Sequence, residues 1–408
     1  MIPNISDTSA VSEAIGDDLL ASDDLALRLK LWYIKLEPWL ESHGYYLYSS
    51  KHDLSNLTVQ EKRRMALSKK PVEYPIAHVG DKSFEARRFS HMFNIHPAVT
   101  KDHQDVIIKP IFTEEDDSEV VILRYLMSER CRSDPLNMTM VTFDVLTIDT
   151  RLSLAVMPRW GSHFIMLDGF GTLGTALEFV HCMLKGLTFL HNNLIAHRDI
   201  HPGNVLVNFY DSRANFRKSC QSFFATGQAK FVIIDLGLSV IFPPDSDPLS
   251  RVCPAWESDC GSPEYHPPDV IDRQSETMYD PFAFDVACMG GMLCDAVGYL
   301  TPFFPSFAPL FDRMITPDIP SRLTASQALD EFSRILANID PKLLAMEAPL
   351  PPPATCTWHS RDRWANLPAE FVEAHTKEYP PVRPKAKIYQ PDGMFIFQDM
   401  YPPAETLT

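Results

Sequence analysis

Apolar residues recur at helical spacing in several parts of the chain. Over residues 171–193 they mark one face of a long helix, at Leu173, Leu177, Val180, Leu184, Leu187 and Leu190. The same spacing within residues 23–48 predicts an N-terminal helix, which two aspartates open, Pro38 kinks or ends, and Gly44 limits. Three more helices are predicted at about residues 117–130, 283–298 and 324–338.

Runs of β-branched residues predict buried strands between these helices. The clearest is DVIIKPI at residues 105–111, and the stretches VLVNF and KFVIIDL, after Asn204, flank a polar insertion at about 209–229. Eleven prolines between Pro349 and Pro403 predict an irregular C-terminal tail. The chain as a whole is thus predicted to contain both helices and strands.

The composition limits the partners that the protein can have. Its 37 basic and 53 acidic side chains give a net charge of −16, which disfavours binding to nucleic acid and to anionic membrane surfaces. The chain has no window of 18 uninterrupted apolar residues, so no membrane span is predicted. Its eight cysteines form no CxxC pair and its start has no signal-like run, so we expect reduced thiols in a cytoplasmic or nuclear protein.

The stretch IAHRDIHPGNVLVN, at residues 195–208, carries the strongest chemical signal. Phosphoryl transfer needs a carboxylate at the acceptor hydroxyl, metal ligands, and cations on the phosphates. Asp199 can face the acceptor hydroxyl, and Asn204, five residues later, offers a neutral oxygen to Mg²⁺. Asp235 follows an apolar strand in VIIDLG, where a carboxylate can bind a divalent cation that bridges phosphates.

A lysine and a glutamate upstream complete this set. Lys109 ends the apolar run VIIK and is predicted to contact the α and β phosphates of a nucleotide, while Glu119 lies on a helix and is predicted to hold Lys109 in an ion pair. Taken singly, such residues are more often solvated surface charges. Their order and spacing relative to Asp199, Asn204 and Asp235 favour a phosphotransferase.

The sequence resembles the eukaryotic protein kinase superfamily, in particular its Ser/Thr type, over roughly residues 80–340. GSPEYHPPD at 261–269 is similar to the end of that family's activation segment, and FDVACMGGML at 284–293 is similar to one of its core helices. SRLTASQAL at 321–329 is similar to a later segment of the family, and LAVMPRWGS at 154–162 resembles the hinge. This hinge and the N-terminal GYYLY also resemble a divergent fungal branch of the family.

The resemblance implies roles for five further residues. Asp285 would hold the backbone of the catalytic loop, and Met157 would be the gatekeeper beside the hinge. Arg322 would pair with Asp269, the acid that ends the substrate loop. Ser262 stands where the Ser/Thr type has a threonine that reaches back to the catalytic aspartate.

The resemblance also implies a fold and a reaction. The expected fold is of the α+β class, bilobal and protein kinase-like, with a small β-rich N-lobe, a larger helical C-lobe, an N-terminal helical extension and a Pro-rich C-terminal tail. The expected bounds are 1–69 for the extension with its amphipathic helix, 70–160 for the N-lobe and hinge, 161–345 for the C-lobe, and 346–408 for the tail. The expected cofactors are ATP and Mg²⁺, and the expected partner is a protein substrate, with neither nucleic acid nor membrane.

Two positions depart from the family's pattern. The window RRFSHM at 87–92 stands where the family has a glycine-rich loop over the phosphates, and the nearest upstream glycine is Gly80. His201 stands two residues after Asp199, where Ser/Thr kinases have a lysine on the γ-phosphate, and a neutral imidazole lacks that fixed charge. Two alternatives therefore stay open: a pseudokinase scaffold that binds nucleotide weakly or not at all, and a small-molecule phosphotransferase, which the spelling HPGN favours.

Arg198, beside the catalytic aspartate, is the residue that pairs with an activating phosphate in kinases switched by phosphorylation. Ser250 and Ser258 are candidate phosphorylation sites in the segment that follows the catalytic region. Glu257 and Asp259 lie in the same segment and could pair with Arg198 instead. Our hypothesis is that this acid replaces phosphorylation in part; the alternative is a solvated acidic loop without that role.

Overall fold

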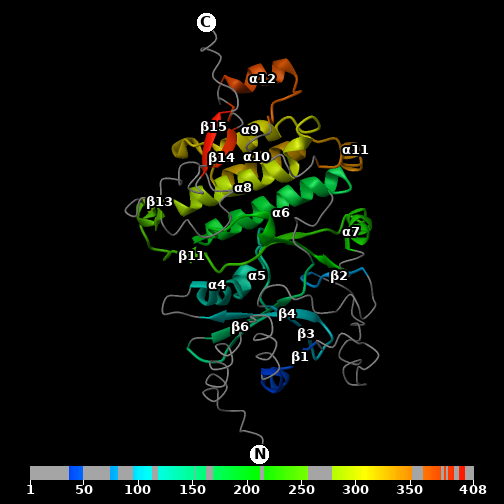
Figure 1. Ribbon diagram of the computed structural model, residues 1–408, viewed down its shortest axis with the longest axis vertical. Helices are drawn as coiled ribbons and strands as arrows, with labels where there is room; N and C mark the ends of the chain where they lie inside the picture. The colour runs from blue at the N-terminus through cyan, green and yellow to red at the C-terminus, as the bar shows by residue number, and fades with distance from the viewer. Residues whose placement is uncertain are drawn as a thin grey trace, which may run out of the picture. The chain divides into compact units, whose positions relative to one another are not determined.

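The computed structural model divides into two compact units. The sheet unit consists of Met1–Asp134, Thr139–Ser162 and Leu206–Ala229, and the helical unit of Pro135–Met138, His163–Val205 and Lys230–Thr408. The structure describes residues 36–48, 74–80, 95–112, 118–150, 152–161, 169–211, 216–255, 278–351, 362–377, 381–382, 385–389 and 395–399. Figure 1 labels many of the elements found in these ranges. Each unit is therefore assembled from segments that lie far apart in the sequence.

The sheet unit is built on a five-stranded antiparallel sheet. Its strand order is β1-β3-β4-β6-β5. The bounds are Tyr45–Leu47 for β1, His96–Thr100 for β3, Asp105–Phe112 for β4, Asp144–Thr147 for β5 and Leu152–Pro158 for β6. The strand predicted at 105–111 is thus confirmed as β4. The two edge strands are joined by a hydrogen bond of 3.2 Å from the Tyr45 hydroxyl to Asp144 Oδ2, so the sheet is curled.

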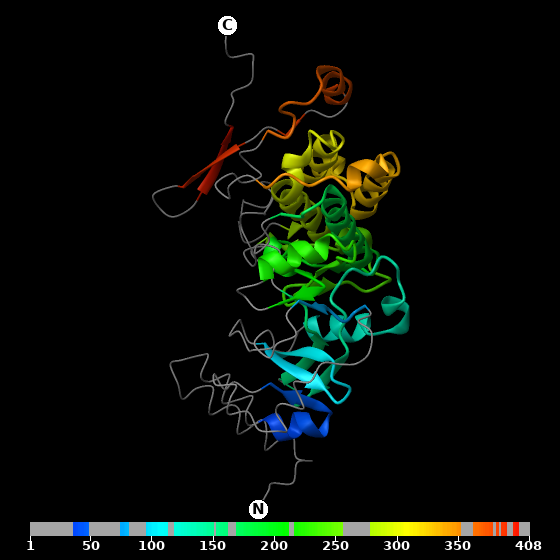
Figure 2. The same cartoon turned by 90° about the vertical axis from the view of Figure 1, so that its right-hand side faces the viewer.

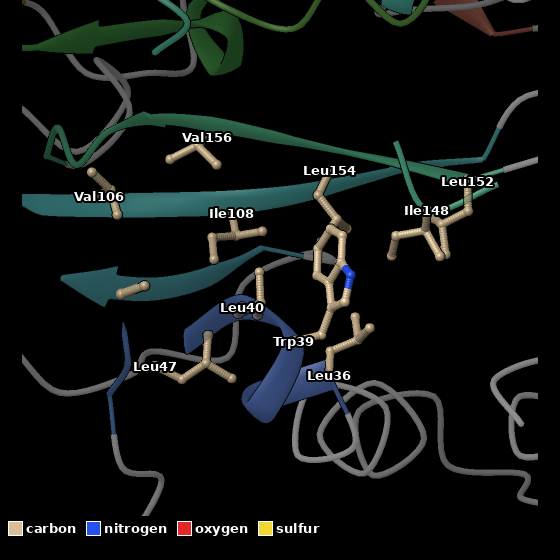
Figure 3. Close-up of a cluster of buried hydrophobic side chains, with 11 residues drawn as sticks. Leu36, Trp39, Leu40, Leu47, Val106, Ile108, Ile148, Leu152, Leu154 and Val156 are labelled. Carbon is tan, nitrogen blue, oxygen red and sulfur yellow. The ribbon is translucent and has the colours of Figure 1, made fainter. Parts of the chain in front are cut away.

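A short helix over residues 36–42 covers the sheet (Figure 2, in blue). Its apolar side chains share one buried cluster with the central strands, which includes Leu36, Trp39, Leu40, Val106, Ile108, Leu154 and Val156 (Figure 3). Gly44 follows the helix with a φ of +86°, a conformation that glycine adopts at little cost. The described part of the predicted N-terminal helix therefore continues through Pro38 and stops before Gly44, while residues 23–35 lie outside the described ones.

The helix predicted at 117–130 is two helices, α4 Ser118–Leu126 and α5 Glu129–Arg132. The side chain of Ser128 accepts a hydrogen bond from the backbone N–H of Cys131, at 3.4 Å, and so caps α5. A serine that satisfies a free N–H in this way favours the start of a new helix over the continuation of the old one.

The segment predicted as a polar insertion contains regular structure. Strand β9, Phe209–Tyr210, pairs in parallel with β2, His78–Val79, and helix α7 spans Phe216–Phe224. Phe223 of α7 stacks on Phe209 with 5.0 Å between the ring centroids. A two-residue parallel pair between distant segments leaves no periodic pattern in the sequence, so the prediction missed it.

Four helices form the body of the helical unit: α6 Leu173–Asn192, α8 Pro281–Val297, α9 Phe307–Ile315 and α10 Ala325–Ala337. Three of them confirm the helices predicted at 171–193, 283–298 and 324–338, and each of the three begins after a capping side chain: Thr172, Asp280 and Thr324. Helix α9 was not predicted. Its first turn holds Pro309, which is tolerated there because the first N–H groups of a helix have no partner within it.

Two of these helices have the length and composition of membrane spans. They cover Leu173–Asn192 and Pro281–Leu300, with mean hydropathies of 1.2 and 1.3. However, 78% and 83% of their apolar windows are buried inside the folded protein. Such burial is typical of core helices, which need an apolar surface all round.

The residues after 349 are not irregular throughout, contrary to the prediction. They include α12, Ala369–Thr376, and a hairpin of β14, Lys385–Tyr389, with β15, Phe395–Asp399, drawn in red in Figure 2. Each of these elements occupies a stretch that is free of proline. The prediction of an irregular tail rested on the proline content of the whole region, so it missed these short proline-free stretches.

The tail is attached to α9 through Asp312, whose side chain is 3% exposed. This carboxylate accepts hydrogen bonds from Arg363 Nε at 2.8 Å and Nη2 at 2.6 Å, from Trp364 Nε1 at 2.7 Å and from the backbone N–H of Val382 at 2.9 Å. Arg363 is equally buried, at 2% exposed. A buried carboxylate with four donors fixes these two parts of the tail on the helical unit.

Candidate functional site

Asp285 of α8 holds the loop that carries the strongest sequence motif. Its side chain is fully buried and accepts hydrogen bonds from the backbone N–H of His197, at 2.6 Å, and of Arg198, at 2.7 Å. His191, at the end of α6, lies 3.1 Å from the same carboxylate. Arg198 has a φ of +68°, an unfavourable conformation for a side-chain-bearing residue, and the bonds to Asp285 maintain it next to Asp199.

Asp199 is held at one of its two carboxylate oxygens. Asn204 Nδ2 donates to Asp199 Oδ2 at 2.7 Å and to the Asp199 carbonyl at 2.9 Å, and His201 Nε2 lies 3.5 Å from Oδ2. The other oxygen, Oδ1, is buried and has no hydrogen-bond partner among the described residues. A buried acceptor without a partner is costly, so Oδ1 is suited to a donor from a bound ligand.

The environment of Asp199 keeps it ionised. Burial alone would raise the pKa of this carboxyl, but the hydrogen bond and charge interaction with His201 lower it, with smaller contributions from His197 and Asn204. The lowering contributions win, so the pKa of Asp199 lies below its usual value. The carboxylate form is therefore the one present at neutral pH.

Asp235 lies beside Asn204 through backbone contacts. It follows strand β10, Phe231–Ile233, is exposed, and has a φ of +66°. The N–H of the preceding residue, Ile234, donates to the carbonyl of Asn204 at 2.9 Å, and the Ile234 carbonyl lies 3.0 Å from His197 Nε2. Asp235 and Asn204 can thus offer a carboxylate and an amide oxygen to one hard cation. The described residues contain no group of three His, Cys, Asp or Glu that could hold a metal ion by itself.

The sheet unit contains the predicted contact between Lys109 and Glu119. Lys109 Nζ lies 2.7 Å from Glu119 Oε1, from strand β4 to the first turn of helix α4. Glu119 is 7% exposed and Lys109 is 23% exposed, so the pair is mostly shielded from water. Met157 is a buried residue of β6 and pairs with Ile107 of β4 in the same sheet.

Arg198 has a partner that the sequence did not suggest. Its Nε donates to the hydroxyl of Tyr279 at 3.0 Å. Tyr279 lies on strand β13, Met278–Tyr279, which pairs with β12, Cys253–Pro254. Glu257 and Asp259, which were expected to pair with Arg198, lie outside the described residues. No sequence motif identifies Tyr279 as a partner of Arg198, because the contact depends on the pairing of two strands that are not adjacent in the sequence.

Arg322 binds backbone carbonyls in the described part of the chain. Its Nε and Nη2 donate to the Thr316 carbonyl at 3.0 and 2.7 Å, and its Nη1 donates to the Ala283 carbonyl at 3.0 Å. The expected partner Asp269 and the candidate Ser262 lie outside the described residues, as does the window 87–92. The predicted pairing of Arg322 with Asp269 therefore stays a prediction.

Comparison with known proteins finds one matching family. The family model for the protein kinase domain matches residues 124–308. This match supports the resemblance of these residues to the eukaryotic protein kinase superfamily. The matched part of the chain contains Met157, the catalytic-loop residues, Asp235 and Asp285, whereas Lys109, Glu119 and Arg322 lie outside it.

Three individual relatives are kinases by name, two of them Ser/Thr kinases. The serine/threonine-protein kinase PTK1/STK1 of Saccharomyces cerevisiae is 30% identical over 35% of this chain and 21% of its own length. The probable serine/threonine-protein kinase MARK-A of Dictyostelium discoideum is 29% identical over 45% of this chain and 15% of its own length, and cyclin-dependent kinase 20 of Pongo abelii is 30% identical over 31% and 29%. The chain thus spans less than a third of the length of each of these relatives.

Proposed function

We propose that this kinase domain transfers the γ-phosphate of ATP to a hydroxyl of a protein substrate, with Ser/Thr specificity. The observation that carries the proposal is Oδ1 of Asp199, an ionised, buried acceptor without a partner among the described residues. A substrate hydroxyl that donates to Oδ1 would satisfy it and would be oriented for attack on phosphorus. The relatives named as Ser/Thr kinases support the choice of hydroxyl.

The residues at the site fit ATP with Mg²⁺. The side-chain nitrogen Nδ2 of Asn204 donates to Asp199, so the side-chain oxygen Oδ1 of Asn204 is the atom that can bind a cation. Asp235 supplies a charged oxygen. In this proposal Lys109, held by Glu119, contacts the α and β phosphates, and Met157 is the gatekeeper of the adenine site. Bound Mg²⁺ would neutralise charge that develops on the phosphates.

A pseudokinase scaffold is the second candidate, and one structural observation favours it. Strand β1 ends at Leu47 and β3, its neighbour in the sheet, begins at His96. These strands are therefore not joined by a short glycine loop of the kind that clamps phosphates. The retained acceptor at Asp199 favours the enzyme, because a scaffold has no chemical need of it.

The setting of the domain belongs to the same proposal. We place the kinase in the cytoplasm or nucleus, acting on proteins and not on nucleic acid or membranes. In this proposal residues 1–69 form an N-terminal extension and residues 346–408 a C-terminal tail. The contacts of Asp312 with Arg363 and Trp364 support a structural role for the start of that tail.

The test is phosphate transfer from Mg-ATP to Ser/Thr peptides by the wild type and by Asp199→Asn. We expect the substitution to lower kcat by about a hundredfold to ten-thousandfold, because the amide cannot accept the proton. Asp330→Asn, at an exposed position of α10, is the matched control and should leave kcat unchanged. If the wild type binds ATP but transfers no phosphate, the scaffold is correct. Binding at ATP a hundredfold above Kd would raise the free energy of unfolding by about 2.7 kcal/mol.

A further inference from the structure

His201 is fixed by the backbone that follows it. It precedes the short 3₁₀ helix Pro202–Asn204 in an extended conformation, with φ −157° and ψ 166°. Its Nδ1 accepts a hydrogen bond from the N–H of Gly203 at 3.1 Å. A backbone N–H can only donate, so Nδ1 carries no hydrogen and the proton of the neutral ring lies on Nε2.

The protonated nitrogen faces the catalytic carboxylate. Nε2 of His201 lies 3.5 Å from Oδ2 of Asp199, the oxygen that also accepts from Asn204 at 2.7 Å. Nε2 of His201 and the amide of Asn204 thus both approach the same oxygen. With Oδ2 held from two sides, the carboxylate cannot rotate freely, and the direction of the unpartnered Oδ1 is set.

Gly203 leaves room for this ring. A Cβ at position 203 would lie 2.5 Å from Cε1 and 2.9 Å from Nδ1 of His201, so the ring would have to move. The φ of Gly203 is not positive, so its backbone conformation does not itself require glycine. The glycine is therefore explained by the imidazole, and a lysine at position 201 would place no ring there.

We propose that His201 is the positioning residue of Asp199 and does not supply a cation to the transferred phosphate. The inference rests on the proposed phosphotransfer function. The imidazole donates from Nε2 to Oδ2, while the Gly203 N–H holds its other nitrogen, so Oδ1 faces the acceptor hydroxyl.

The kinetic test compares His201→Lys, Gly203→Ala and the double variant in the full chain. Gly203→Ala displaces the ring, so we expect kcat to fall about tenfold to a hundredfold while the KM for ATP stays within about twofold. His201→Lys should lower kcat similarly. In the His201→Lys background, Gly203→Ala should have little further effect, because no ring remains to be displaced. Gly298→Ala is the control, since its Cβ would meet the nearest atoms at 3.9 Å.

Three kinetic outcomes would overturn the inference. A rise in kcat on His201→Lys would mean that the site needs the charge. Equal losses from Gly203→Ala in the two backgrounds would mean that the glycine acts independently of the ring. A raised KM for ATP with an unchanged kcat would mean that His201 binds nucleotide and does not position Asp199.

An NMR measurement separates this inference from the proposed function. In ¹⁵N spectra of the histidine rings, the signals that disappear in His201→Lys identify His201. At neutral pH they should show the proton on Nε2, shift in Asp199→Asn, and change in Gly203→Ala, whether or not phosphate is transferred. A wild type with this spectrum and no transfer refutes the function alone. A ring whose only proton lies on Nδ1 overturns the inference.

Discussion

At the scale of single residues, the hydrogen bond between Tyr45 and Asp144 makes the stability of the sheet unit depend on pH. The pKa of Tyr45 is raised to about 12, first by burial and then by the charge and hydrogen bond of Asp144. In the unfolded chain the hydroxyl titrates near 10. The folded state thus holds this proton more tightly, and the associated stability is fully present below about pH 10 and lost as the pH rises toward about 12.

Tyr45→Phe should therefore weaken the alkaline loss of stability. We expect the free energy of unfolding of the wild type to fall more between about pH 9 and about pH 11 than that of the variant, because the variant has no hydroxyl to titrate. Urea unfolding at the two pH values measures the difference. Tyr74→Phe, at a ring that is 49% exposed, is the control and should behave as the wild type does. An identical fall in wild type and Tyr45→Phe would contradict the assignment.

The residues of the site differ in how far their contacts could be predicted. The contacts of Asp199 with Asn204 and His201 lie within one short motif, where spacing alone brings the side chains together. The contact of Arg198 with Tyr279 spans 81 positions and arises from tertiary structure. Sequence motifs therefore identify the reacting groups better than the residues that support them.

At the scale of elements, α9 and the tail depend on one buried ion pair. Asp312→Asn should remove the charge that compensates Arg363, which is 2% exposed. We expect the free energy of unfolding to fall by about 3–5 kcal/mol, since the remaining arginine would be buried without its partner. Chemical denaturation measures this loss, and faster proteolysis after residue 349 should accompany it.

The same tail offers a matched control for that prediction. Lys377 and Glu373 form an ion pair at 2.9 Å in which both side chains are 73% exposed. Glu373→Gln should change the free energy of unfolding by less than about 1 kcal/mol, because water screens an exposed pair. If both substitutions cost the same, Asp312 does not anchor the tail.

Element prediction succeeded where a helix or strand carries its own periodicity. Helices α6, α8 and α10 have apolar faces and N-terminal caps, and β4 has a β-branched run, all of which are local properties. Helix α12 and the β14–β15 hairpin are short elements within a proline-rich region, and composition over the whole tail concealed them. Length and local pattern thus decided which elements were found.

At the scale of the whole chain, the sheet unit collects distant segments around Asp105. This residue of β4 is 7% exposed and accepts hydrogen bonds from the hydroxyls of Tyr48 and Tyr210. The guanidinium of Arg159, just after β6, lies 4.9 Å from the centroid of the Tyr210 ring. The N-terminal segment and the segment around β9 are therefore integral parts of the sheet unit. No local pattern predicts such a cluster, because its members are up to 162 positions apart.

The last prediction concerns the N-terminal segment, which lies outside the matched kinase domain at residues 124–308. Trp39 is 7% exposed in the cluster between the helix over residues 36–42 and the central strands. Trp39→Ala should lower the free energy of unfolding by about 3–5 kcal/mol, because it leaves a cavity in the core of the sheet unit. Urea unfolding measures the loss, and the amides of β4 and β6 should exchange hydrogen faster. Phe112→Ala, at a ring that is 48% exposed on β4, should cost less than about 1 kcal/mol. Equal losses of unfolding free energy for the two substitutions would mean that the N-terminal segment adds little to the stability of the sheet. The expected difference would mean that this segment is part of the structure that holds Lys109 and Glu119 in place.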